Sequence, residues 1–160
     1  MRTMRWLIGL GVMAATTLLA CGDDEPAGPQ EERFTAALSG ENEVPPVTTE
    51  ATGTATFTIR GDSLFYELTV SNITGVTASH IHGPADPGVN AGVLLLLYSS
   101  QGPTGPINGT LATGKATASD VNGISIDSLF TLLRNGKAYV NVHTAAHPPG
   151  EIRGQITRAN

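Results

Sequence analysis

The stretch TGTATFTIRGDSLFYELTVS, residues 52–71, decides the fold class. In residues 52–60 apolar side chains alternate with threonines, and residues 63–71 again alternate apolar with mostly polar side chains. Alternation with a period of two gives a β-strand one apolar and one polar face. Gly61 and Asp62 supply a turn between the two halves. The stretch therefore predicts a β-hairpin with one buried face.

Further short runs of β-forming residues follow the hairpin, separated by segments rich in proline and glycine. They cover residues 76–82, 92–98, 110–118, 138–143 and 151–157. Only 14% of the residues are charged. Many short strands at this spacing are typical of all-β domains. We expect an antiparallel Greek-key sandwich or flattened barrel, similar to the immunoglobulin or superoxide dismutase folds.

The segment SIDSLFTLLRNG, residues 125–136, departs from this alternation. Its apolar residues recur at intervals of three and four, as they do on one face of a helix. Ser125 or Asp127 can cap the start of such a helix, and Gly136 can end it. We predict one short helix near residues 125–135, with its apolar face against the core.

Residues 1–20 have the pattern of a bacterial lipoprotein signal peptide. A basic start, MRTMRW, precedes a short apolar run that ends in LLAC. Cleavage there would make Cys21, the single cysteine of the chain, the acceptor for a lipid anchor. The alternative is an ordinary secretory signal with an unmodified cysteine. The acidic segment 21–32 is expected to be a solvated tether, followed by one domain over residues 33–160.

The composition argues against several function classes. The net charge is −5, and the few basic residues are scattered, so we expect no nucleic acid partner. The chain has no Gly-x-Ser-x-Gly elbow, glycine-rich phosphate loop or HExxH motif. The sequence thus indicates no catalytic residue, and an enzymatic role is not expected.

Five segments in order resemble the CHRD domain, the repeat named after chordin. They are SGENEVPPV (39–47), ATGTATF (51–57), ASHIHGPA (78–85), NGKAYVNVHT (135–144) and PGEIRGQI (149–156). The resemblance runs over residues 33–157 and implies an all-β, immunoglobulin-like module. Such modules occur in tandem in chordin, an extracellular antagonist of bone morphogenetic proteins, and singly in bacterial exported proteins. The resemblance implies no particular reaction.

Three histidines are candidates for a metal site. His80 and His82 are two residues apart in a predicted strand, so both point to one face. If the strand that ends at His143 is a neighbour, three imidazoles converge and could bind zinc or copper. His147, in a proline-flanked loop, could supply a fourth nitrogen. The alternative is structural: the histidines hydrogen-bond to backbone carbonyls, to Glu43 or to one another, and fix the strand register.

A second resemblance supports the metal hypothesis. HIHGPADPGVNAG and NVHTAAHPPGEIRGQI are similar to the two copper-ligand segments of copper-zinc superoxide dismutases. However, no histidine lies between His82 and His143, and a single cysteine cannot form the disulfide of those enzymes. The resemblance therefore implies a dismutase-like fold and possible copper or zinc binding without dismutase turnover.

Charged residues near the two ends of the domain suggest a structural ion pair. Glu43 precedes two prolines, and Glu151 and Arg153 share one face of the last predicted strand. We expect Arg153 to pair with Glu43 or Glu151 and so to link the two ends of the domain.

The sequence predicts an exported protein, attached to a bacterial membrane through a lipid on Cys21. Gly22 does not resemble the aspartate that retains lipoproteins at the inner membrane of enteric bacteria, so the outer membrane is preferred. The expected function is that of a binding or structural module at the cell envelope, with an envelope protein or surface polymer as partner. The alternative is a metal-binding protein that holds copper or zinc at His80, His82 and His143.

Overall fold

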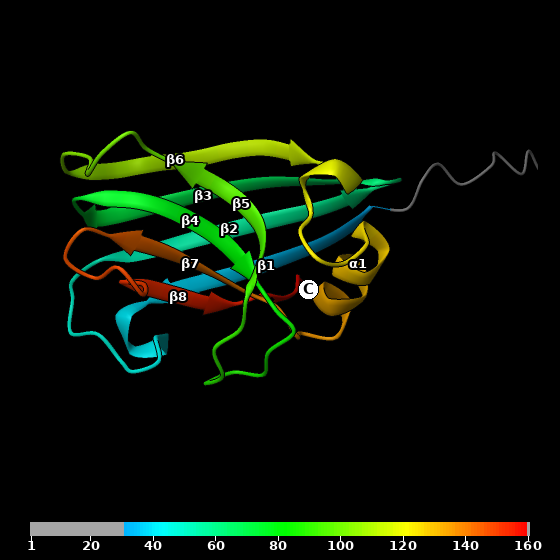
Figure 1. Cartoon of the computed structure of the whole chain (residues 1–160), viewed down its shortest axis with the longest axis horizontal. Helices are drawn as coiled ribbons and strands as arrows, with labels where there is room; N and C mark the ends of the chain where they lie inside the picture. Colours follow the sequence, from blue (N-terminus) through cyan, green and yellow to red (C-terminus); the bar gives the residue numbers. More distant parts are fainter. Residues whose placement is uncertain (1–30, 160) are drawn as a thin grey trace, which may run out of the picture.

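The computed structural model describes residues 31–159, which form a nine-stranded antiparallel sheet and one α-helix (Figure 1). The strand order is β5-β4-β7-β8-β1-β2-β3-β6, and β9 pairs with β1. The strands are β1 (Glu32–Ser39), β2 (Thr52–Arg60), β3 (Ser63–Ile73), β4 (Val76–His82), β5 (Val93–Ser99), β6 (Ile107–Ala116), β7 (Tyr139–Thr144), β8 (Ile152–Gln155) and β9 (Thr157–Arg158). The predicted signal peptide and the lipid acceptor Cys21 lie outside the described residues.

The predicted hairpin is strands β2 and β3. Their register places Phe57 opposite Tyr66 and Ala55 opposite Leu68. Phe57, Ala55 and Leu68 are fully buried, whereas the threonines between them on β2 are more exposed. Burial of a large apolar side chain contributes about 1.5–3 kcal/mol. The period-two alternation therefore orients the hairpin with its apolar face toward the core.

The sheet curls into a nearly closed, flattened barrel. The end strands β5 and β6 contact each other, and Leu95 on β5 forms an isolated antiparallel bridge with Val121. The Tyr66 hydroxyl on β3 also donates a hydrogen bond to the Leu97 carbonyl on β5 (3.4 Å). These contacts between the two ends of the sheet confirm the predicted all-β sandwich or flattened barrel.

Helix α1 (Ile126–Arg134) lies at one end of the barrel (Figure 1). The Ser125 hydroxyl caps it by accepting a hydrogen bond from the Ser128 amide (3.1 Å). Gly136 follows with a φ of 63°, a left-handed conformation that favours glycine. The predicted helix, its cap and its buried apolar face are confirmed. Within residues 31–159, none of the helices has the length and apolar character needed to span a membrane.

Two 3₁₀-helices interrupt the β pattern, η1 (Gly40–Asn42) and η2 (Ala118–Asp120). The first begins the segment that carries Glu43. The Val47 amide donates to the Gly40 carbonyl (2.9 Å), and a Cβ on Gly40 would lie only 2.2 Å from the Val47 carbonyl oxygen. This close approach folds the segment back on itself, and η1 packs beside β8.

Candidate metal centre

Strands β4 and β7 carry all three histidines on the outer face of the barrel. The antiparallel register places His80 opposite Asn141, and His82 and His143 are each two residues away from this pair on the same face. The residue between the first two, Ile81, is fully buried in the core. Alternation within each strand and pairing between the strands together position the group.

The three imidazoles converge. One ring nitrogen from each histidine lies within 4.8 Å of the corresponding nitrogens of the other two. The ring centroids are 5.6 Å apart for His80 and His82, 4.9 Å for His80 and His143, and 6.0 Å for His82 and His143. Tetrahedral ligands at a metal–nitrogen distance of about 2.0–2.1 Å are roughly 3.4 Å apart. Modest side-chain rotations would therefore bring the group into ligand geometry.

Backbone carbonyls determine which nitrogens are free. His82 Nδ1 lies 3.0 Å from the Ala91 carbonyl oxygen, and His143 Nδ1 lies 2.8 Å from that of Pro148. A carbonyl oxygen only accepts, so each Nδ1 carries the proton and donates it. Both Nε2 atoms then keep their lone pairs. His80 Nδ1 lies 3.0 Å from His143 Nε2 and donates its proton to that lone pair. A metal ion would replace this proton, with Nδ1 of His80 and Nε2 of the other two histidines as its ligands.

The surroundings keep two of the imidazoles neutral. Burial, reinforced by the neighbouring His143 and His82, lowers the pKa of His80 from 6.5 to about 4. Burial also lowers the pKa of His82, although the Ala91 carbonyl and the Asn141 side chain partly oppose the shift. Metal ligands must be deprotonated. Both rings are therefore neutral at neutral pH, and in His80 the proton has to move from Nδ1 to Nε2 before Nδ1 can bind a metal.

The aromatic ring of Tyr139 and the guanidinium of Arg153 support the His82 ring. Its ring stacks on that of Tyr139 (centroids 4.9 Å apart, 4° between the planes), and the Arg153 guanidinium carbon lies 3.4 Å from the centre of the Tyr139 ring. Arg153 Nη2 donates to the Val89 carbonyl (2.7 Å) and Nη1 to Asn90 Oδ1 (3.0 Å). These contacts fix the loop that presents the Ala91 carbonyl to His82.

The predicted partners of Arg153 differ from those observed. Among the ion pairs of residues 31–159, none joins Arg153 to Glu43 or Glu151. Glu151 instead accepts hydrogen bonds from the hydroxyls of Thr49 and Thr144 (2.7 Å each). Burial raises the pKa of Glu43, while Arg153 lowers it by a smaller amount. Arg153 thus acts on Glu43 through its charge, and it donates its hydrogen bonds to Val89 and Asn90 in the loop.

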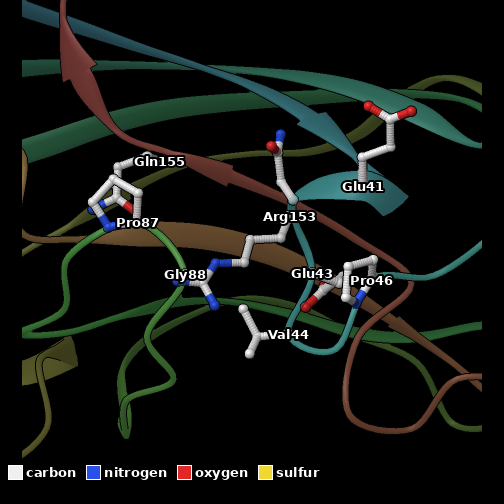
Figure 2. Close-up of a pocket in the computed structure, with 9 residues that line it drawn as sticks. Glu41, Glu43, Val44, Pro46, Pro87, Gly88, Arg153 and Gln155 are labelled. Atoms are coloured by element: carbon white, nitrogen blue, oxygen red, sulfur yellow. The ribbon is translucent and has the colours of Figure 1, made fainter.

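A cavity of about 410 Å³ lies beside Arg153 (Figure 2). Figure 2 shows the guanidinium of Arg153 directed between Gly88 and Val44, with Glu43 and Pro46 on one side and Pro87 and Gln155 on the other. None of the three histidines lines this cavity. The cavity therefore lies next to Arg153, which supports His82 through Tyr139, and is separate from the candidate metal centre.

The sequence identified the three histidines but not the residues that orient them. Tyr139 and Asn141 alternate with valines on the same strand as His143, and this alternation could have indicated them. Ala91 and Pro148 act through backbone carbonyls, which the residue type does not reveal. His147, which could have supplied a fourth nitrogen, does not belong to the three-histidine group.

The fold and this group define a class of protein: a flattened all-β barrel with three converging histidines on its outer face. The family model of the CHRD domain matches residues 34–156, and the chain belongs to the CHRD domain family. Neither the comparison with curated proteins nor that with solved structures found a match. The resemblance to superoxide dismutases therefore remains a sequence observation.

Proposed function

We propose that this CHRD domain is a metal-binding module that holds one copper or zinc ion with His80, His82 and His143. The observation that carries the proposal is the convergence of three ring nitrogens within 4.8 Å of one another. The hydrogen bonds from His82 to Ala91 and from His143 to Pro148 support it, because they leave a lone pair on the Nε2 atom of each of these two rings.

The structural role of the histidines explains only part of this arrangement. It accounts for the hydrogen bonds of His80 and His143. It leaves His82 Nε2, which is buried and has no hydrogen-bond partner among the described residues. Buried polar atoms without partners are rare in native proteins, and one that faces two other imidazoles is suited to a cation.

The ligand set is compatible with both metals. Imidazole nitrogens suit copper and zinc, and the Irving–Williams order gives Cu²⁺ the higher affinity at a site of given ligands. Three protein ligands leave a fourth position for water. We propose no dismutase turnover, because the bridging and zinc-binding histidines of those enzymes have no counterpart between His82 and His143.

We also propose that the domain acts at the cell envelope, exported and attached through a lipid on Cys21, with the outer membrane preferred. Support comes from the LLAC motif after a basic start and a short apolar run. An envelope protein or surface polymer as an additional partner stays a prediction. Labelling of cells with a radioactive fatty acid, with Cys21→Ser as the control, tests the anchor.

Metal analysis of the purified protein tests the metal proposal. The mature chain with Cys21→Ser is incubated with copper or zinc, desalted and analysed by mass spectrometry. We expect about one ion per chain for this protein and for the matched control His147→Ala, and little for the double variant His82→Ala/His143→Ala. Equal, negligible metal in all three proteins would refute the proposal.

A further inference from the structure

Buried polar atoms without partners gather next to the three histidines. Among residues 31–159 they include His82 Nε2, Asn141 Oδ1 and Glu43 Oε1. Asn141 belongs to the same outer face, opposite His80 and two residues from His143. Its Nδ2 and Glu43 Oε1 both lie beside Gly150, and its side chain opposes the lowering of the His82 pKa, so the three residues form one polar cluster.

The Asn141 amide has a defined orientation in this cluster. Its Nδ2 donates to the Pro149 carbonyl (3.4 Å). A Cβ on Gly150 would lie 2.2 Å from Glu43 Oε1 and 2.8 Å from Asn141 Nδ2, so both atoms pack against the same glycine. If the amide were flipped, its oxygen would face the Glu43 carboxylate and the Pro149 carbonyl. Repulsion between these oxygens therefore keeps Nδ2 next to Gly150. The Oδ1 atom then points away from Gly150 and Glu43.

This orientation leaves two acceptors without a donor. His82 Nε2 carries a lone pair because Nδ1 donates to Ala91, and Asn141 Oδ1 is an acceptor as well. A metal ion on Nε2 satisfies the imidazole but not the amide. A water molecule bound to that ion satisfies the amide, since it donates hydrogen bonds and occupies the position that three protein ligands leave open.

We propose that Asn141 is a positioning residue of the metal centre: its Oδ1 accepts a hydrogen bond from the water that completes the coordination of the ion, and Glu43 fixes the orientation of the amide. This inference rests on the proposed metal-binding function. It adds an exchangeable position on the ion, where a small external ligand can replace water, and it assigns a role to the buried carboxyl of Glu43, which is only 6% exposed.

The test uses the mature chain with Cys21→Ser, loaded with Cu²⁺. The variants are Asn141→Leu, which removes both polar ends of the amide, and Glu43→Gln, which removes the charge that orients it. Asn122→Ala, at an exposed asparagine outside the cluster, is the control. Copper affinity is measured by competition with a chelator. Electron–nuclear double resonance in H₂O and D₂O detects the exchangeable protons of copper-bound water and the imidazole nitrogens.

We expect three imidazole nitrogens and exchangeable water protons in the parent protein and in Asn122→Ala. In Asn141→Leu the three nitrogens should remain, the proton couplings should change, and the affinity should fall about 10-fold or more, as for other residues that orient metal ligands. Glu43→Gln should show the same changes to a smaller extent. If Asn141→Leu does not fold, the proton couplings and copper affinities of Asn141→Ser and Glu43→Gln decide the test.

Unchanged proton couplings, together with an affinity within about twofold of the parent in the folded variants, would overturn the inference while the metal centre stands. Failure of the parent protein to bind copper would instead refute the proposed function, and this inference with it. Loss of imidazole nitrogens from the spectrum of Asn141→Leu would also contradict the inference, because Asn141 would then hold the histidines rather than the water.

Discussion

Replacement of Arg153 by methionine should both destabilise the domain and weaken metal binding. Arg153 is 2% exposed and donates two hydrogen bonds, of 2.7 and 3.0 Å, to the loop at Val89 and Asn90. Hydrogen bonds from a charged donor contribute about 1.5–3 kcal/mol each, and the contact with the Tyr139 ring adds up to about 2 kcal/mol. Relief from burying a charge offsets several kcal/mol of this sum. We therefore expect a net loss of about 2–4 kcal/mol.

Urea unfolding of the metal-free protein measures the stability, and chelator competition measures copper affinity. Arg153→Met should lower the affinity by about 10-fold, because the loop no longer holds the Ala91 carbonyl against His82. Arg33→Met, at an arginine whose side chain is 68% exposed, is the matched control and should change neither quantity. A free energy of unfolding within about 0.5 kcal/mol of the parent would refute this account of Arg153.

Two further predictions follow from the histidine cluster and from Gly150. The pKa of His80 is about 4 when folded against 6.5 when free, so the unfolded chain binds more protons between these values. The free energy of unfolding of the metal-free protein should therefore be highest above pH 6.5 and fall as the pH drops toward 4, and urea titrations of parent and His80→Phe should show a smaller fall in the variant. Gly150→Ala should destabilise by about 1–3 kcal/mol or more, because its φ is 142° and the new Cβ meets Glu43. Thermal melts measure this loss, and the control Gly102→Ala, whose new Cβ meets nothing within 4 Å, should be neutral in them.

The fold was predictable because its determinants are local. Alternation at residues 52–60 and 63–71 sets the two faces of the β2–β3 hairpin, and helical spacing with a serine cap sets α1. Closure of the barrel is different. It depends on contacts between strands far apart in the sequence, such as the Tyr66 hydroxyl with the Leu97 carbonyl, for which the sequence has no periodic signal.

The same distinction applies to the candidate site. The pairing of a His-x-His strand with the strand of His143 could be expected, since period-two orientation directs all three side chains to one face. The partners of Arg153 could not, because they lie in a loop of prolines and glycines whose path no pattern predicts. A carbonyl such as that of Ala91 can orient an imidazole whatever side chain its residue carries.

X-ray absorption spectroscopy of the copper- and zinc-loaded protein tests the central claim most directly. It measures the number, type and distance of the atoms bound to the ion. The account predicts three imidazole nitrogens at about 2.0–2.1 Å together with one oxygen ligand from water, and loss of the imidazole scattering in His82→Ala/His143→Ala. A metal without histidine ligands, or the same spectrum from the double variant, would contradict it.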